Sequence, residues 1–411
     1  MARKLVVCCD GTWNTPRKAT NIFRTYTFLR DHLKTPNEVP HKEGVTTCAG
    51  KAHDGNEVML FYDRGVGTSW FDHLLGGGVG AGLSENVRDA YSFLAQNFTP
   101  GAEIYIFGFS RGAYTARSLC GFIKAAGLLD HPSAFDVARA YLDCYITADH
   151  VVATPTGWDL DRVRRRLVEQ AGDIVGRIGR DVSTLPRHAG VKIKFIGVYD
   201  TVGALGVPLA GAERINEPIV GFHDTGFADL IDHAVHALAV DERRGPYVPT
   251  LWTQPAGTSL LPTQSVLQVW FPGVHSDIGG GYTDKGIGNI TWDFMMRQAA
   301  HRGLVIDPAE PTPKVDVETL PAQHESFNEK WKKLSAELRC VPEGVRMVGP
   351  TVTGPGGQTL KVAGEVRLHP SVAGRLGKDC TTILDESPDR RSTGSYAPAN
   401  VKVDCLPLFA S

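Results

Sequence analysis

The chain has 411 residues, of which 42% are hydrophobic and 21% are charged, a composition typical of a soluble globular protein. The 43 Lys and Arg residues nearly balance the 45 Asp and Glu residues and give a net charge of −2. This balance offers no electrostatic basis for binding nucleic acid or an anionic membrane. The length allows one large core with insertions, or two domains.

The N-terminal apolar run, Leu5 to Cys9, is too short for the core of a signal peptide and stops at Asp10. No stretch approaches the roughly 18 apolar residues of a membrane span. We therefore expect synthesis in the cytoplasm, with any export by a route that needs no signal peptide. The 8 cysteines include no Cys-x-x-Cys pair, which argues against zinc-knuckle and thioredoxin sites and favours reduced, buried thiols.

Apolar runs that end in glycine-containing turns recur along the chain, and helical patterns follow most of them. The predicted strands are Lys4–Cys9, Glu57–Tyr62, Glu103–Phe107, Lys192–Tyr199 and Val266–Phe271. The predicted helices are Asn21–Leu33, Ser84–Phe98, the stretch from the serine turn to Ala126, and Phe227–Val240. Continuous apolar strands that alternate with helices predict an α/β fold with a mostly parallel sheet and helices on both faces.

Two stretches interrupt this alternation. Residues 127–190 are polar and helical in pattern, and they lie where a cap or lid could be inserted. After residue 300 a Pro-rich stretch (307–323) precedes an amphipathic helical pattern (325–339) and short Gly/Pro-rich strands. We predict a catalytic domain over residues 1–300, with a helical insertion at 127–190, and a small C-terminal extension over residues 301–411 packed on the core.

Every predicted strand is followed by a polar side chain in a glycine-containing loop. These side chains are Asp10, Asp63, Ser110, Asp200 and His275. The carboxyl ends of parallel strands meet at one edge of a sheet, where ligands bind, so we expect these groups to form one constellation. Acidic residues also favour loops for reasons of backbone conformation, which is the alternative explanation.

The sequence Gly-Phe-Ser-Arg-Gly, residues 108–112, lies between the third predicted strand and a helical pattern. In such a nucleophile elbow, the turn is so tight that Gly108 and Gly112 must lack side chains, and the serine hydroxyl is lifted above the sheet. Ser110 is therefore a candidate nucleophile, and the backbone amide of Arg111 is a candidate oxyanion donor. The alternative is a polar residue in a glycine-rich turn.

A nucleophilic serine needs a base, and the base needs an orienting carboxylate. Asp200 and His275 follow later strands, in the chain order Ser, acid, His of α/β-hydrolases. We expect His275 to take the proton of Ser110 and Asp200 to orient His275. His236, in a stretch predicted to be helical, and His369, in a loop, are the alternative bases.

Other assignments stay open at this edge of the sheet. Asp277, two residues after His275, is an alternative orienting acid. The Asp-Gly-Thr loop after the first strand occupies the usual place of the second oxyanion donor, so we expect the amide of Thr12 to serve there. Alternatively, Asp10 caps this turn and Gly11 only supplies a positive φ.

The strand-end carboxylates suggest a divalent metal as a further alternative. Asp10, Asp63, Asp200 and Asp277 would be its ligands, but the serine turn would then have no purpose, so we expect no metal or organic cofactor.

The glycine-rich stretch 76–87 is interpreted as a loop or a close backbone contact, with binding of an anionic headgroup as the alternative. The apolar residues just before it form either buried core or a lipid-touching rim; they are Trp70, Phe71, Leu74 and Leu75.

Six motifs taken together resemble one protein family. They are CCDGTWN, FYDRGVGT, IFGFSRGAYTAR, FIGVYDTVGALG, HALAVDERR and VWFPGVHSDIGGGY, and LHPSVAGRL near residue 370 is similar to a late family motif. The family is the catalytic domain shared by the first class of type VI secretion phospholipase effectors and by many uncharacterised bacterial and fungal proteins. The resemblance implies an α/β-hydrolase fold with a triad at Ser110, Asp200 and His275, and cleavage of acyl chains from phospholipids.

We therefore predict a serine-dependent carboxylic ester hydrolase of the lipase or phospholipase type that forms an acyl-enzyme. The expected partner is an ester or phospholipid substrate, with peripheral membrane contact as one way to reach it and no role for nucleic acid. The alternatives are a metal-dependent hydrolase and a non-catalytic binding module with a hydrolase fold. The oligomeric state stays open.

Overall fold

A computed structural model of the chain describes residues 3–11, 19–65, 81–146, 181–202, 230–254, 257, 259–315, 320–328, 332, 346, 348, 351–353, 359–384, 390–398, 400 and 407. Several sequence-based predictions lie outside these residues. They concern Thr12, the apolar stretch before residue 76, the glycine-rich residues 76–80, the middle of the insertion at 147–180, and most of the amphipathic pattern at 325–339.

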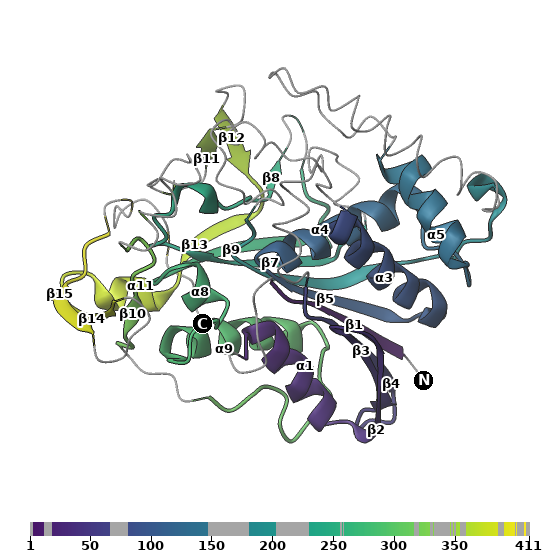
Figure 1. Ribbon diagram of the computed structural model, residues 1–411, viewed down its shortest axis with the longest axis horizontal. Helices are drawn as coiled ribbons and strands as arrows, with labels where there is room; N and C mark the ends of the chain where they lie inside the picture. The colour runs from purple at the N-terminus through teal and green to yellow at the C-terminus, as the bar shows by residue number, and fades with distance from the viewer. Residues whose placement is uncertain are drawn as a thin grey trace.

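The described core is a nine-stranded sheet with the strand order β13-β9-β7-β6-β5-β1-β4-β3-β2 (Figure 1). Neighbouring strands from β13 to β4 are parallel, and β3 and β2 add an antiparallel hairpin at the far edge. The strands are β1 (Arg3–Cys9), β2 (Lys34–Lys42), β3 (Val45–Lys51), β4 (Glu57–Asp63), β5 (Glu103–Phe109), β6 (Ile193–Tyr199), β7 (His233–Ala239), β9 (Ser265–Phe271) and β13 (Glu365–Leu368). The predicted α/β class with a mostly parallel sheet is confirmed.

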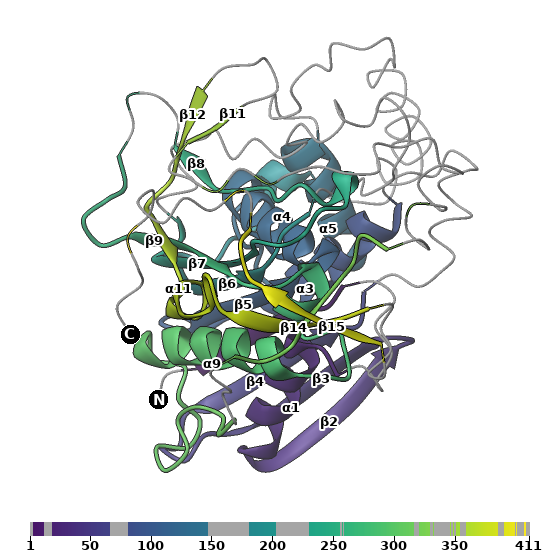
Figure 2. The same ribbon diagram turned by 90° about the vertical axis from the view of Figure 1, so that its left-hand side faces the viewer.

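Helices cover both faces of this sheet (Figures 1 and 2). On one face lie α3 (Ala81–Asn97) and α4 (Arg111–Ala126), and on the other lie α1 (Asn21–Asp31) and α9 (Gly286–His301). Strand β1 serves both layers because successive side chains point to opposite faces. Its Leu5 and Val7 belong to the apolar cluster with α3 and α4, whereas Val6 belongs to the cluster with α1 and α9. Burial of each such side chain contributes about 1.5–3 kcal/mol.

One predicted helix is wrong. Within the predicted helix Phe227–Val240, the residues His233–Ala239 form β7, which pairs with β6 and β9 in parallel; residues 227–229 of this prediction lie outside the described part. Alanine and leucine favour a helix in isolation, which explains the error. Burial on both faces, between two strands, outweighs that local preference. The β2–β3 hairpin is not predicted from the sequence, because all residues of its first strand are exposed and this polar strand lacks an apolar alternation.

The smaller elements lie in and around the predicted insertion and extension. The described elements between residues 127 and 190 are helix α5 (Ala134–Ala140), the π-helix η1 (Tyr141–Ile146) and the 3₁₀-helix η2 (Val182–Thr184). After residue 300 lie β10 (Gln323–His324), β11 (Thr351–Thr353), β12 (Thr359–Val362), α11 (Pro370–Arg375), β14 (Asp379–Ile383) and β15 (Arg391–Ser395). The other short elements are η4 (Gly245–Tyr247), β8 (Thr253–Gln254) and α8 (His275–Ile278).

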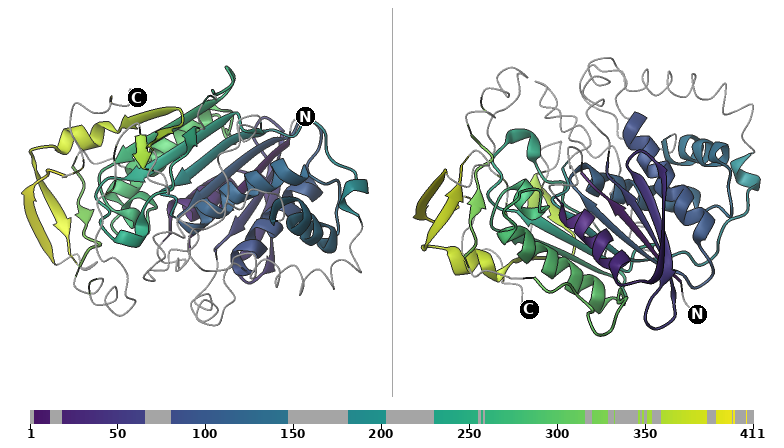
Figure 3. Two further views of the ribbon diagram at one scale, coloured as in Figure 1. Left: turned by 90° about the horizontal axis from the view of Figure 1, so that it is seen from above. Right: turned by 60° about the horizontal axis from the view of Figure 1, so that its bottom comes forward.

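The C-terminal segment is joined to the main sheet. Its strand β13 pairs with β9 as a parallel edge strand, with Leu368 opposite Trp270. Figure 3 shows β14 and β15 beyond this side of the sheet, away from the β2–β3 hairpin. In the part of the chain that the structure covers, no helix is both long and apolar enough to cross a membrane.

Candidate active site

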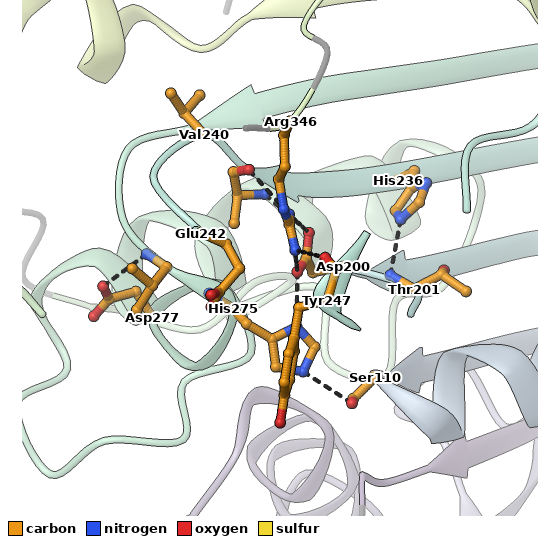
Figure 4. Close-up of polar contacts among 12 residues, drawn as sticks. Ser110, Asp200, Thr201, His236, Val240, Glu242, Tyr247, His275, Asp277 and Arg346 are labelled. Carbon is orange, nitrogen blue, oxygen red and sulfur yellow. Dashed lines mark hydrogen bonds and ion pairs between the residues drawn. The ribbon is translucent and has the colours of Figure 1, made fainter. Parts of the chain in front are cut away.

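Three predicted site residues meet at the carboxyl edge of the sheet (Figure 4). Ser110 follows β5, Asp200 follows the neighbouring strand β6, and His275 opens the short helix α8 after β9. The sheet order reverses at β1, whose two neighbours are β4 and β5. Open parallel sheets form ligand-binding crevices at such a switch point, and Ser110 stands directly beside it.

The turn around Ser110 has the geometry of a nucleophile elbow. Ser110 has φ 57° and ψ −121°, a conformation that residues other than glycine rarely adopt. A Cβ on Gly112 would overlap the carbonyl oxygen of Cys9, and a Cβ on Gly108 would lie 2.6 Å from the Cα of Ala113. Both flanking positions therefore require glycine, because β1, β5 and α4 approach one another too closely for a side chain.

A hydrogen-bond chain links the three side chains. The Nδ1 atom of His275 lies 2.7 Å from Oδ2 of Asp200, and its Nε2 atom lies 2.9 Å from Oγ of Ser110. An ionised carboxylate only accepts hydrogen bonds, so Nδ1 carries the proton and Nε2 accepts from the Ser110 hydroxyl. His275 is thereby held in the tautomer that a general base needs.

The charge states of Asp200 and His275 in this hydrogen-bond chain favour proton transfer at neutral pH. Burial would raise the pKa of Asp200, but Arg346 and His275 outweigh burial and hold this pKa well below its usual range. Burial lowers the pKa of His275 below its usual value, although Asp200 offsets part of this effect. Asp200 is therefore ionised and His275 is neutral at neutral pH, which leaves His275 free to accept a proton.

The main partner of Asp200 is Arg346, a residue to which no sequence pattern assigns a role. Its Nη1 and Nη2 atoms lie 2.6 and 2.9 Å from Oδ1 and Oδ2 of Asp200. The backbone amide of Ala239 also donates to Oδ1 of Asp200 at 3.0 Å. Together with His275, these donors satisfy both carboxylate oxygens, so the negative charge of Asp200 is fully hydrogen-bonded although the residue is completely buried.

A second unassigned residue, Glu242, fixes the backbone at His275. Its Oε2 atom accepts from the amide of His275 at 3.2 Å, and Oε1 accepts from Oγ of Ser326 at 2.9 Å. Arg244 binds both carboxylate oxygens at 3.0 and 2.9 Å. Burial would raise the pKa of Glu242, but Arg244 lowers it to about 2, so Glu242 is ionised. Glu242 belongs to the HALAVDERR motif, which contributes to the family resemblance although the sequence assigns Glu242 no role.

Aromatic rings enclose the imidazole of His275. The ring of Phe109 lies 4.8 Å from it and the ring of Tyr247 lies 5.1 Å from it, centroid to centroid. The guanidinium of Arg244 lies 3.6 Å from the centre of the Tyr247 ring. A Cβ on Gly279 would overlap the ring of Phe109, so this glycine lets the histidine loop lie against β5. These contacts restrict the imidazole to the orientation that faces Ser110.

The two alternative bases lie in other environments. Nε2 of His236 accepts from the amide of Thr201 at 3.1 Å, and Figure 4 shows this pair apart from the hydrogen-bond chain of Ser110. Burial lowers the pKa of His236 to about 3. His369 caps the N-terminus of α11, where its Nδ1 accepts from the amide of Ser371 at 3.2 Å. Neither histidine is hydrogen-bonded to Ser110 in the structure.

The remaining strand-end acids bind separate parts of the chain. Asp277 binds His324, with 2.6 Å between Oδ1 and Nδ1, rather than His275. Asp10 accepts from Thr20 Oγ1 at 2.6 Å, from Tyr62 and from the Gly11 amide, which matches the turn-capping alternative for Asp10. The Asp63 carboxylate accepts from the amide of Gly65 at 2.8 Å. Among the described residues, no group of three or more His, Cys, Asp and Glu side chains is arranged to hold a metal ion.

Of the two predicted oxyanion donors, Arg111 lies within the described residues and Thr12 does not. Arg111 is the first residue of α4, directly after Ser110. The amides of a first helical turn have no acceptor within their own helix, so they can point toward an anion. The other predicted donor, the amide of Thr12, lies outside the described residues, and its role stays a prediction.

With this geometry in place, sequence comparison identifies the family. A family model described as the catalytic domain of Tle1-like phospholipase effectors of the type VI secretion system matches residues 3–298. The chain belongs to this family. The matched region of the Tle1-like domain contains Ser110, Asp200 and His275, and it ends before Arg346.

Individual relatives of the Tle1-like chain are distant. An uncharacterised protein of Saccharomyces cerevisiae is 27% identical over an alignment of 263 residues, and the match covers 61% of this chain and 34% of that protein. The structure of the Tle1 effector bound to the VgrG spike has a TM-score of 0.33 and 17% identity, over 70% of this chain and 52% of that chain. An uncharacterised protein from Pseudomonas aeruginosa has a TM-score of 0.34 and 16% identity, over 74% and 46%. This chain spans about a third to about half of the length of these relatives.

Proposed function

We propose that the chain is a serine-dependent carboxylic ester hydrolase of the lipase or phospholipase type, with an α/β-hydrolase fold. The observation that carries the proposal is the hydrogen-bond chain from Ser110 Oγ through His275 to Asp200, at 2.9 and 2.7 Å. The elbow at Ser110 and the chain order Ser, acid, His support it. The family's description as a phospholipase effector domain supports phospholipid as the substrate.

The reaction begins with attack of Ser110 Oγ on the ester carbonyl carbon, while His275 Nε2 takes the hydroxyl proton. Asp200 stabilises the imidazolium that forms. The amide of Arg111, with Thr12 as the second donor, binds the oxyanion of the tetrahedral intermediate. The intermediate expels the alcohol, which leaves with the proton from His275, and the acyl group stays on Ser110.

Deacylation repeats these steps with water as the nucleophile. His275 removes a proton from water, the resulting oxygen attacks the acyl carbon, and the carboxylic acid leaves as Ser110 recovers its proton. Every proton transfer in the cycle uses Nε2 of His275. No step requires a metal or an organic cofactor.

A panel of carboxylic esters and diacyl phospholipids, assayed with wild type and Ser110→Ala, tests this function. We expect wild type to release fatty acid and Ser110→Ala to lose at least about 10³-fold in kcat, because the substitution removes the oxygen that attacks the ester. EDTA should leave the wild-type rate unchanged. Hydrolysis by Ser110→Ala at the wild-type rate, or activity that EDTA abolishes and a divalent ion restores, would reject the serine mechanism.

A further inference from the structure

Arg346 is buried at the catalytic edge although it comes from a distant part of the chain. It lies beyond residues 3–298, the region that the family model matches, and 146 positions after Asp200. Only 5% of Arg346 is exposed, and Asp200 is fully buried. The segment after residue 300 therefore brings a cation into direct contact with the carboxylate that orients His275 (Figure 4).

The contact with Asp200 is bidentate and further constrained. Each terminal nitrogen of Arg346 binds one carboxylate oxygen and one backbone carbonyl oxygen. Nη1 binds Ala239 O at 3.0 Å, and Nη2 binds Tyr247 O at 2.5 Å. A planar guanidinium matches a carboxylate in this way, whereas a lysine ammonium does not. Arg346 thus fixes both the position and the rotation of the Asp200 carboxylate relative to the ends of β7 and η4.

The C-terminal segment also holds the loop that follows β7. Ser326 donates to Glu242, which binds the amide of His275. Tyr396 donates to Asp241 at 3.0 Å, and Nδ2 of Asn400 donates to the carbonyls of Val240 and Arg346 at 3.0 and 3.2 Å. Ser326, Tyr396 and Asn400 thus all bind residues 240–242, the loop whose Glu242 holds the amide of His275. The Arg346 contact is therefore one of several that this segment makes beside the triad.

We propose that Arg346 is a positioning residue of the active site and that the segment carrying it is an integral part of the catalytic unit. Arg346 holds the Asp200 carboxylate where its Oδ2 accepts from Nδ1 of His275, and it neutralises the charge that Asp200 buries. This inference rests on the proposed hydrolase function. It adds to the family-matched region a residue without which the triad is not correctly oriented.

Loss of Arg346 has an electrostatic consequence that a purely structural role lacks. The titratable and charged groups around His275 are Ser110, Asp200, Glu242, Arg244 and Tyr247. Without Arg346, the charge of Asp200 is less compensated and stabilises the imidazolium more strongly. The pKa of His275 therefore rises, and the acidic limb of the pH profile of kcat/KM moves to higher pH.

The test compares Arg346→Met and Arg346→Lys with Arg375→Met in the full chain. Arg375 is also a buried arginine of the same segment, but it donates to Pro321 O and to Gln323 Oε1. We expect Arg346→Met to lose about 10- to 100-fold in kcat, with KM for a short-chain ester nearly unchanged. The acidic limb of its kcat/KM profile should move to higher pH. Arg346→Lys should show a smaller loss in kcat and a smaller shift of this limb. Folded Arg375→Met should keep the wild-type kcat and pH profile.

Wild-type kcat and an unmoved acidic limb in Arg346→Met would overturn the inference. An equal loss in Arg375→Met, with no shift of either pH profile, would also overturn it, because the loss would then be structural. If Arg346→Met does not fold, a folded Arg346→Lys with wild-type kcat and pH profile gives the same negative answer. A separate NMR titration of the His275 ring must show a higher pKa in the Arg346 variant. This readout needs no substrate, so it separates failure of the inference from failure of the proposed hydrolase function.

Discussion

Ser110 and Asp200 both have positive φ angles, 57° and 40°, at the ends of neighbouring strands. Such a conformation costs on the order of 1–3 kcal/mol for a residue other than glycine and persists only where the surroundings enforce it. Here the amide of Ser110 donates to Tyr199 O at 3.1 Å, and the amide of Asp200 donates to Ala237 O at 2.7 Å. Both strained residues, Ser110 and Asp200, belong to the hydrogen-bond chain, so the backbone strain lies in the candidate active site.

Gly112 is the residue at which this local geometry is least tolerant. An alanine there places its Cβ against the carbonyl oxygen of Cys9, so β1 and α4 must separate. We predict that Gly112→Ala lowers the free energy of unfolding by about 1–3 kcal/mol, measured by urea denaturation.

Gly374 in α11 is the matched control. A Cβ on Gly374 meets nothing within 4 Å, and alanine there is expected to be neutral or to stabilise by about 0.5–1 kcal/mol. Equal effects of the two substitutions would show that the elbow does not require a glycine at position 112.

Some residues of the candidate site could be predicted from the sequence and others could not. Ser110, Asp200 and His275 could be predicted because each follows an apolar strand and because the Gly-x-Ser-x-Gly spacing has a steric cause. Arg346 and Glu242 could not be assigned. Arg346 lies in a Gly/Pro-rich stretch with no regular pattern, and its partner is 146 positions away. Only the folded chain brings a charge from that distance to Asp200.

The histidine loop between β9 and α8 is held by the loop that follows β7. Oδ2 of Asp241 accepts from the amide of Gly273 at 2.5 Å and from the hydroxyl of Tyr396 at 3.0 Å. The amide of Asp241 donates back to Gly273 O at 3.0 Å. This reciprocal contact lies two residues before His275, so it connects β7, β9 and the C-terminal segment at the active site.

Burial raises the pKa of Asp241 to about 7. The folded state therefore binds the Asp241 proton more tightly than the unfolded state, in which an Asp has a pKa of about 4. The stability that this proton contributes is complete below about pH 4 and is lost as pH rises to about 7. We predict that wild type loses stability relative to Asp241→Asn across this window, measured by urea denaturation at several pH values. Parallel curves for the two proteins would contradict the assignment.

The elements themselves differ in how clearly the sequence encodes them. Strands β1 and β5 are mostly apolar runs, β9 is apolar apart from Ser265 and Gln268, and α1, α3 and α4 have helical apolar periodicity, so their type could be predicted. Strand β7 could not, because its alanines and histidines favour no sheet until β6 and β9 enclose them. The edge strand β13 has four residues and depends on its pairing with β9. Whether a short or alanine-rich segment forms a strand therefore depends on the strands that pair with it.

The parallel sheet brings segments that are distant in the sequence together at one of its edges. Ser110, Asp200 and His275 come from three strands, and Arg346 comes from beyond the family-matched region. The segment after residue 300 contributes a strand to the sheet and side chains to the supports of the triad. The boundary predicted at residue 300 stays a prediction, and hydrogen bonds from Ser326 and Arg346 cross it at the candidate active site.

Covalent labelling with a fluorophosphonate tests the central claim most directly, because the probe reacts with a serine only when a base activates it. We predict one adduct per chain, located on Ser110 by peptide mass spectrometry. It should be absent in Ser110→Ala and formed much more slowly in His275→Gln. An unlabelled wild-type protein, or a probe that reacts at another residue while ester hydrolysis is inhibited, would contradict the role of Ser110 as the nucleophile.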